Sequence, residues 1–122
     1  MQFDHERLDV YQVSIQFVSW ANQLLDGPLD GKRGSVTKQL ERASTSIPLN
    51  IAEGNGKPSR KDRSRYLNIA RGSALESAAC LDVIVARELL TRADVATGKG
   101  LLLRIVGMLT KLTARLLGQD AA

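Results

Sequence analysis

The chain has 122 residues, of which 43% are hydrophobic and 25% charged, a size and composition typical of one globular domain rather than a disordered chain. Its single cysteine, Cys80, excludes an internal disulfide and a cysteine-based metal cluster. The formal net charge of +4 favours an anionic partner. Charges near the N-terminus argue against a signal peptide, and no apolar run could span a membrane, so we expect a cytoplasmic protein.

Apolar residues recur at helical spacing in four segments, and no segment alternates as a strand would. The expected helices cover about residues 5–25, 35–53, 59–90 and 93–117. Gly27-Pro28 ends the first, Gly54-Asn55-Gly56 is expected to end the second with positive φ angles, and Pro58-Ser59 starts the third. Short connections between four helices predict one domain over residues 1–122, an all-α, up-and-down antiparallel four-helix bundle.

The first predicted helix carries two apolar stripes on different faces. The stripe assigned to the core consists of Leu8, Tyr11, Ile15, Val18, Asn22 and Leu25. The second stripe consists of Val10, Val13, Phe17, Trp20 and Leu24. Because an outer helix of one bundle cannot bury two opposite faces, we expect the second stripe to form an oligomer interface. The alternative is a set of tolerated surface hydrophobic residues.

Polar residues also fall on the predicted helix seams. Asn50, Glu53 and Glu76 are expected to form structural hydrogen bonds, with Arg42, Arg71 or the hydroxyl groups around Ser73 as partners. A carboxylate metal site of the kind built inside some bundles needs Glu-x-x-His pairs, which this sequence lacks. The only histidine, His5, has no second His or Cys at ligand spacing.

Motifs of common enzyme classes are missing. Gly56-Lys57 and Thr97-Gly98-Lys99-Gly100 lack the spacing and the preceding strand of a phosphate-binding loop. Cys80 lies in an apolar helical pattern without a nearby histidine base, which indicates a packed thiol. We therefore expect no enzymatic activity, no cofactor and no metal.

Positive charge is concentrated where the second predicted helix gives way to the third. Six Lys or Arg residues and a single acid, Asp62, lie between Gly54 and Leu75. The candidate nucleic-acid-binding residues in this cluster are Lys57, Arg60, Lys61, Arg63 and Arg65. Cations are unfavourable at a helix N-terminus, and a broken local rule is a reason to look for function. A solvated basic face is the alternative. Lys32, Arg33 and Lys38 are expected at the opposite end of the bundle.

Four sequence blocks resemble the 23S ribosomal RNA intervening-sequence protein family. They are Leu8-x-Val10-Tyr11-Gln12, Leu40-Glu41-Arg42-Ala43, Ser46-Ile47-Pro48-x-Asn50-Ile51-Ala52-Glu53-Gly54, and Tyr66-Leu67-x-Ile69-Ala70-Arg71-Gly72-Ser73-x-x-Glu76. The resemblance covers nearly the whole chain and implies a four-helix bundle that assembles into a ring, a homopentamer. It also implies kinship with the accessory variability protein of diversity-generating retroelements, which has a similar fold and works with a reverse transcriptase and nucleic acid. It implies no catalytic activity.

Two functions remain open from the sequence. The first is a non-enzymatic, ring-forming protein that binds RNA or DNA through phosphates, without reading sequence. The second is a structural or protein-interaction adaptor whose basic surface docks an acidic partner, such as a reverse transcriptase or another nucleic-acid-processing enzyme.

Overall fold

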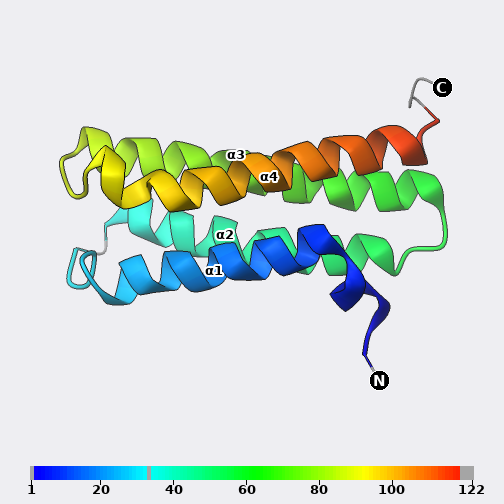
Figure 1. Cartoon of the computed structure of the whole chain (residues 1–122), viewed down its shortest axis with the longest axis horizontal. Helices are drawn as coiled ribbons and strands as arrows, with labels where there is room; N and C mark the ends of the chain where they lie inside the picture. Colours follow the sequence, from blue (N-terminus) through cyan, green and yellow to red (C-terminus); the bar gives the residue numbers. More distant parts are fainter. Residues whose placement is uncertain (1, 33, 119–122) are drawn as a thin grey trace.

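The computed structural model describes residues 2–32 and 34–118, and within them the chain forms four α-helices and no strand (Figure 1). The helices are α1 (Asp9–Asp26), α2 (Ser35–Asn55), α3 (Arg60–Ala86) and α4 (Arg92–Leu116), preceded by the short 3-10 helix η1 (Asp4–Arg7). Successive helices run antiparallel. The α1–α2 and α3–α4 connections lie at one end, and the α2–α3 turn lies at the other, beside η1 and the end of α4 (Figure 1). The all-α bundle is as predicted.

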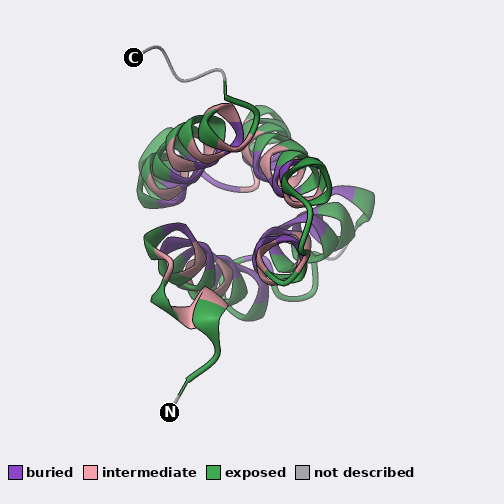
Figure 2. Ribbon diagram, turned by 90° about the vertical axis from the view of Figure 1, so that its right-hand side faces the viewer, coloured by how far each residue is buried: buried purple, intermediate pink, exposed green. Residues whose placement is uncertain are grey.

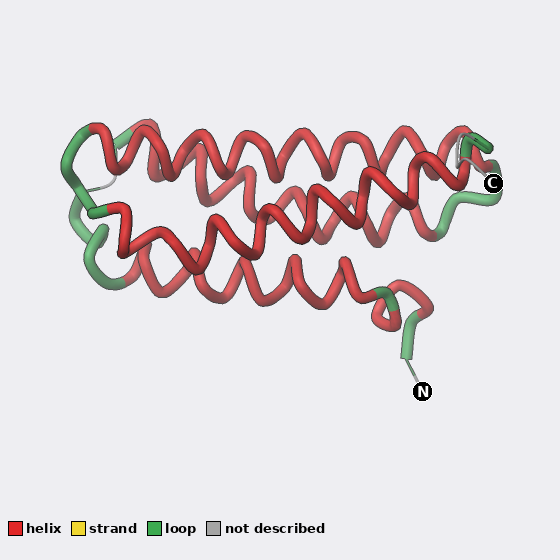
Figure 3. The backbone as a smooth tube through the Cα atoms, turned by 45° about the horizontal axis from the view of Figure 1, so that its top comes forward, coloured by secondary structure: helices red, strands yellow, loops and turns green. Residues whose placement is uncertain are grey.

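The four helices are arranged in a closed cycle. Each packs against its neighbours in sequence, and α1 also packs against α4. In the described part of the chain, no Cα atoms of the diagonal pairs α1–α3 and α2–α4 lie within 8 Å of each other. The α2–α3 pair is the most extensive. The backbone tube shows the long helices lying side by side over most of their length (Figure 3). The bundle therefore has two layers, α1–α2 and α3–α4.

Every helix contributes large side chains to a single core. Viewed along the bundle, buried residues occupy the inward sides of the four helices (Figure 2). Phe17, Ile47, Leu81 and Ile105 are examples from α1, α2, α3 and α4, and each is 0% exposed. Full burial of such a side chain contributes about 1.5–3 kcal/mol.

The face of α1 that points into the core is the stripe that was predicted to form an oligomer interface. Val10, Val13, Phe17 and Leu24 are buried in the core of the same chain, and Trp20 is partly buried against it. The prediction that this stripe forms an oligomer interface is therefore wrong. Both stripes have helical spacing, but turning Phe17 and Trp20 inward removes more apolar area from water than turning in a stripe that contains Asn22.

The stripe that was assigned to the core is only partly buried, with Leu8 and Tyr11 packed against the edge of the core. Ile15 is 43% exposed, Asn22 is exposed, and Tyr11 and Val18 are partly buried. Leu25 alone of this stripe is fully buried.

The end of α2 also differs from expectation. Gly54 is helical and buried, and Gly56 has a φ of −84°, so the expected positive φ angles are absent here. Gly54 serves close packing: a Cβ atom on it would lie 2.8 Å from the Cβ of Tyr66 and 3.2 Å from the carbonyl oxygen of Arg63. Glycine thus lets α2 and α3 approach closely at the turn.

α3 ends four residues earlier than predicted, at Ala86. The turn that follows is closed by a 3.1 Å hydrogen bond from the Leu89 amide to the Ile84 carbonyl, with Glu88 at a φ of 60°. This conformation is usually adopted by glycine. Because Glu88 occupies it here, the residue types contain no signal that α3 ends at this point. Thr91 then caps α4, accepting a 3.2 Å hydrogen bond from the Asp94 amide.

Candidate nucleic-acid interface

The α2–α3 turn is built around a capped start of α3. The Ser59 hydroxyl oxygen accepts a 3.0 Å hydrogen bond from the Asp62 amide. This satisfies one of the free amides of the first helical turn and places an acid near the positive end of the helix dipole. The predicted start signal at Pro58-Ser59 is confirmed.

Arg63 is part of the turn rather than of a free surface. Its Nε donates a 2.6 Å hydrogen bond to the Lys57 carbonyl, and its Nη2 donates a 3.1 Å hydrogen bond to the Asn55 carbonyl. The antiparallel packing puts the C-terminus of α2, where carbonyls lack helical partners and the dipole is negative, beside the N-terminus of α3. One of the cations that looked misplaced on α3 therefore stabilises the end of α2.

Two other cations of the cluster contact the Tyr66 ring. Lys57 Nζ lies 5.1 Å from the ring centroid and Arg65 Cζ lies 5.0 Å from it, both within cation–π range. Lys57 Nζ is also 4.0 Å from a carboxylate oxygen of Glu53. Arg65 remains exposed, whereas Lys57 is partly buried.

Arg60 and Lys61 are exposed, and in the described part of the chain neither forms an ion pair. Lys61 and Arg65 line an open depression of about 610 Å³ between the start of α3 and the end of α4, together with Ile69 and Leu117. The depression shows that these cations of α3 lie beside α4. Of the five residues of the predicted cluster, Arg60, Lys61 and Arg65 are therefore the exposed ones, whereas Lys57 and Arg63 are partly buried.

α4 extends the basic surface, which the sequence analysis missed. Arg104 and Lys111 are exposed on α4, and Arg71 of α3 donates a 3.0 Å hydrogen bond from Nε to the Thr110 hydroxyl of α4. We call the combined set the α3–α4 basic surface: Arg60, Lys61, Arg65, Arg71, Arg104 and Lys111. Lys111 lies at its edge, where it lines a depression with Leu8, Asp9 and Val10 at the start of α1. Asp62 is the only acid in residues 60–75 and 95–118. The absence of acids from α4 beyond Asp94 is the signal that could have found this extension.

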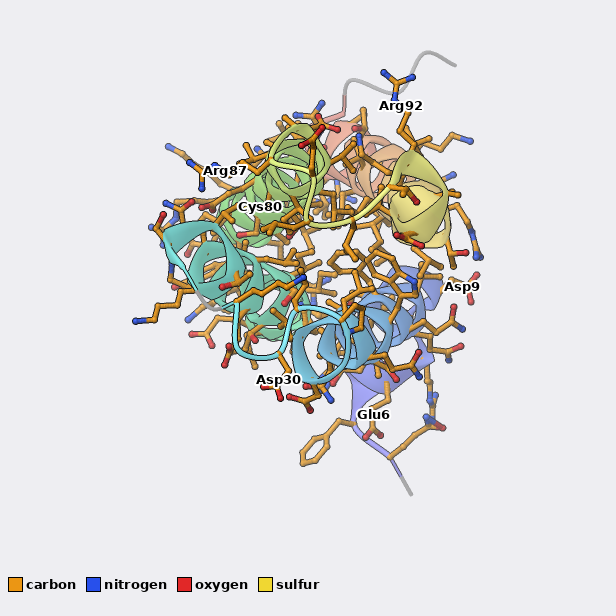
Figure 4. All side chains as sticks on the ribbon, turned by 90° about the vertical axis from the view of Figure 1, so that its left-hand side faces the viewer. Glu6, Asp9, Asp30, Cys80, Arg87 and Arg92 are labelled. Atoms are coloured by element: carbon orange, nitrogen blue, oxygen red, sulfur yellow. The ribbon has the colours of Figure 1, made fainter. Side chains whose placement is uncertain are left out.

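A separate group of cations lies at the opposite end of the bundle. Lys32 and Lys38 are exposed near the α1–α2 connection, and Arg33 lies outside the described residues. Figure 4 views this end and shows Arg87 and Arg92 projecting from the α3–α4 layer, with Asp30 in the α1–α2 layer. Asp26, Asp30 and Glu41 are acids of the same end. As predicted from the topology, Lys32 and Lys38 lie at the end of the bundle opposite the α2–α3 turn.

Of the predicted structural polar residues, Arg42 and Glu76 connect α2 with α3, whereas Asn50 forms its hydrogen bonds within α2. Arg42 forms a 2.9 Å ion pair with Glu76, at side-chain exposures of 68% and 40%, and exposed pairs contribute about 0–1 kcal/mol. Asn50 Nδ2 donates to the Ser46 carbonyl and hydroxyl, both at 2.9 Å, and the Ser73 hydroxyl donates to that of Ser46 at 2.8 Å. Glu53 is exposed, so its predicted place on the core side is wrong.

Cys80 is buried, and burial raises the pKa of its thiol, with Glu76 acting in the same direction and Arg42 opposing. A raised thiol pKa lowers the thiolate fraction and hence reactivity, consistent with a packed thiol. Among the described residues, no three His, Cys, Asp or Glu side chains are placed to hold a metal ion. None of the described helices is long and apolar enough to cross a membrane.

Comparison with known proteins identifies the family. The fold is similar to the crystal structure, at 1.70 Å resolution, of a protein with unknown function from the S23 ribosomal protein family of Bacteroides thetaiotaomicron VPI-5482, with a TM-score of 0.75 and 27% sequence identity over 85% of this chain and 97% of that one. A search of curated proteins gives no significant match. The family model described as 23S rRNA-intervening sequence protein matches residues 6–111. The chain therefore belongs to the 23S rRNA-intervening sequence protein family.

Proposed function

We propose that this protein is a non-enzymatic nucleic-acid-binding protein that contacts phosphates through the α3–α4 basic surface. The observation that carries the proposal is the charge of residues 60–75 of α3 and 95–118 in and after α4, whose exposed cations include Arg60, Lys61, Arg65, Arg104 and Lys111 and whose single acid is Asp62. Phosphate contacts by Lys and Arg release condensed counterions, which supplies sequence-independent affinity. The family's name, taken from a segment of ribosomal RNA, agrees with a nucleic-acid partner.

A charge-reversal experiment tests the proposal. Arg60, Lys61 and Arg65 are changed together to Glu, while Arg63 is kept because it holds the turn. Fluorescence anisotropy of a labelled oligonucleotide across a salt series is expected to show weaker binding and a flatter salt dependence, by about one unit of slope for each lost phosphate contact. Circular dichroism checks that helix content is retained.

The matched control reverses Lys32, Arg87 and Arg92 at the opposite end of the bundle, which changes the net charge by the same amount. Retained binding in this control, with loss in the first variant, locates the interface on the α3–α4 basic surface. Equal affinities and slopes for the wild type and the first variant would refute the proposal. The basic surface would then be examined for an acidic protein partner instead.

We further propose that the copies assemble into the homopentameric ring that the family resemblance implies, using the outer face of α1. Between Asp9 and Asp26 this helix has no charged residue, and depletion of charge is the compositional mark of protein interfaces. The exposed residues of this face are Gln12, Ile15, Gln16, Ser19, Asn22 and Gln23. Such a ring would repeat the α3–α4 basic surface and multiply weak phosphate contacts.

Light scattering after gel filtration tests the assembly. The wild type is expected to have several times the 13.3 kDa mass of one chain, and Ile15→Lys is expected to lower the mass by placing a charge in the interface. Leu103→Lys is the matched control, because Leu103 is 76% exposed on α4. A monomeric wild type at micromolar concentration overturns the oligomer. A lower mass for Leu103→Lys alone overturns the choice of α1.

A further inference from the structure

The outer side of α2 carries an exposed stripe of residues. Leu49 is 62% exposed there. Three more exposed residues lie on the same side, because they precede Leu49 at helical steps of four, three and four positions: Thr45, Arg42 and Lys38. All four residues line one open depression of about 660 Å³. The outer side of α2 therefore presents a shallow trough about 16 Å long, which is about three helical turns.

The outer face of α1 carries a stripe with the same steps. Ile15 is 43% exposed, and exposed residues follow it after four, three and four positions: Ser19, Asn22 and Asp26. When one stripe is taken against the chain direction of the other, the two match in chemistry. Each begins with a large aliphatic residue, continues with a hydroxyl residue and a residue that hydrogen-bonds through its side chain, and ends with a charge. The end charges have opposite signs, Asp26 on α1 and Lys38 on α2.

We infer that the outer side of α2 in one copy receives the outer face of α1 from the next copy, with the two helices antiparallel. This inference rests on the proposed ring assembly. In this register Ile15 packs against Leu49 of the next copy, and the Asp26 carboxylate lies beside the Lys38 ammonium group. The aliphatic pair is removed from water. The opposite end charges favour this register over a parallel arrangement, in which they would not meet.

The topology of the bundle fits a closed ring. A ring larger than a two-fold dimer joins two different faces of the chain, because each copy contacts one neighbour on either side. Since α1 and α2 are antiparallel within one bundle, rotation about an axis along the bundle also makes α1 antiparallel to α2 of the next copy (Figure 1). Asp26 and Lys38 both lie near the α1–α2 connection. Rotation therefore aligns the two stripes with little shift along the bundle, as closure requires.

The same contact leaves the α3–α4 basic surface accessible. α1 and α2 are neighbours in the cycle of helices, so a contact through their outer faces turns successive copies toward the α1–α2 layer. That layer then lines the inside of the ring, and the α3–α4 layer lies on its outside. Leu75 and Leu103 are exposed on α3 and α4 and remain outside the contact.

Light scattering after gel filtration tests the surface on α2. Leu49→Lys places a charge in the contact and is expected to reduce the mass of the wild-type assembly to that of one chain, 13.3 kDa. Leu103→Lys should keep the wild-type mass. Circular dichroism checks that both variants are folded. A wild-type mass for Leu49→Lys overturns the inference while leaving the ring intact, whereas a monomeric wild type removes the ring itself.

Mixing two defective variants shows whether the contact joins different faces. Ile15→Lys retains the surface on α2, and Leu49→Lys retains the face of α1, so the mixture has one intact junction. We expect a complex of about twice 13.3 kDa that neither variant forms alone. If α1 instead packs against α1 of the next copy, Leu49→Lys assembles without a partner and the inference is wrong.

A compensating pair of changes tests the register. Ile15→Lys and Leu49→Glu in the same chain put opposite charges where the aliphatic pair lay. Each change alone is expected to give monomers, and the double variant is expected to recover the oligomer at low salt and to lose it at high salt. A double variant that stays monomeric at low salt would show that Ile15 and Leu49 do not meet.

Discussion

The indole ring of Trp20 on α1 lies against the backbone of Gly98 on α4. A Cβ atom on Gly98 would be 2.1 Å from Cζ3 of Trp20 and 2.3 Å from its Cη2, far inside van der Waals contact. Gly98 is buried within a long helix, where glycine is normally unfavourable. The close approach that it permits helps to join α1 to α4 and so closes the cycle of helices.

We expect Gly98→Ala to destabilise the fold by about 1–3 kcal/mol, because the added methyl group must displace the Trp20 ring. Gly100→Ala is the matched control: Gly100 is exposed two residues along the same helix, and a Cβ atom there would meet nothing within 4 Å. This control should gain about 0.5–1 kcal/mol from helix propensity. Urea unfolding curves measure both, and equal effects of the two changes would contradict the packing argument.

Arg63 should matter for folding and Arg60 should not. Replacing Arg63 with Met leaves the carbonyls of Lys57 and Asn55 without their charged donor, which we expect to cost about 1.5–3 kcal/mol. Arg60→Met removes the same charge from an exposed position and should change stability by no more than about 0.5 kcal/mol. Chemical denaturation separates the two variants. Similar stabilities would mean that the Arg63 hydrogen bonds contribute nothing.

Glu88→Gly should stabilise the protein. Glu88 has a φ of 60°, where a side chain costs about 1–2 kcal/mol, and glycine relieves this strain at a smaller entropic cost. We expect a net gain of about 0.5–1 kcal/mol and a higher Tm. Glu88→Ala keeps the Cβ atom and serves as the control for loss of the carboxylate. A gain of the same size in Glu88→Ala would assign the effect to charge instead of backbone strain.

Acid should weaken the start of α4 through Asp94. The backbone hydrogen bond from Thr91, and then the one with its side chain, lower the pKa of this carboxyl. Because the folded pKa lies below the unfolded one, the stabilisation is complete above the ordinary aspartate pKa and is lost as the pH falls through the folded value. Unfolding measured from about pH 6 to about pH 2 should therefore show a weaker acid dependence in Asp94→Asn than in the wild type. Identical dependences would exclude Asp94 as a contributor.

The helices themselves could be predicted from sequence because each follows from local periodicity and local end signals. Which of the two apolar stripes of α1 faces the core could not be predicted from the sequence. Both have the same spacing, and what decides between them includes a gap in α4 at Gly98 that accepts Trp20, a contact between residues far apart in the chain. The end of α3 was missed for a related reason. Closure of the turn after α3 gives Glu88 a positive φ, which cannot be predicted from a glutamate in the sequence.

The candidate site was predicted in part. The excess of cations near the α2–α3 turn is visible in the sequence, but the carbonyls that hold Arg63 belong to the last residue of α2 and to the turn that follows it. Their position depends on antiparallel packing. The contribution of Arg104 and Lys111 depends in turn on the register between α3 and α4, which the Arg71–Thr110 hydrogen bond reveals.

The extensive pairing of α2 with α3, joined only by residues 56–59, also bears on how the chain folds. Contacts between neighbours in sequence form quickly because little chain entropy is lost in closing them, whereas the α1–α4 contact must wait for the ends of the chain to meet. We expect a transition state organised around the α2–α3 hairpin. Substitutions such as Ile47→Val should then mainly slow folding, and Phe17→Leu should mainly accelerate unfolding.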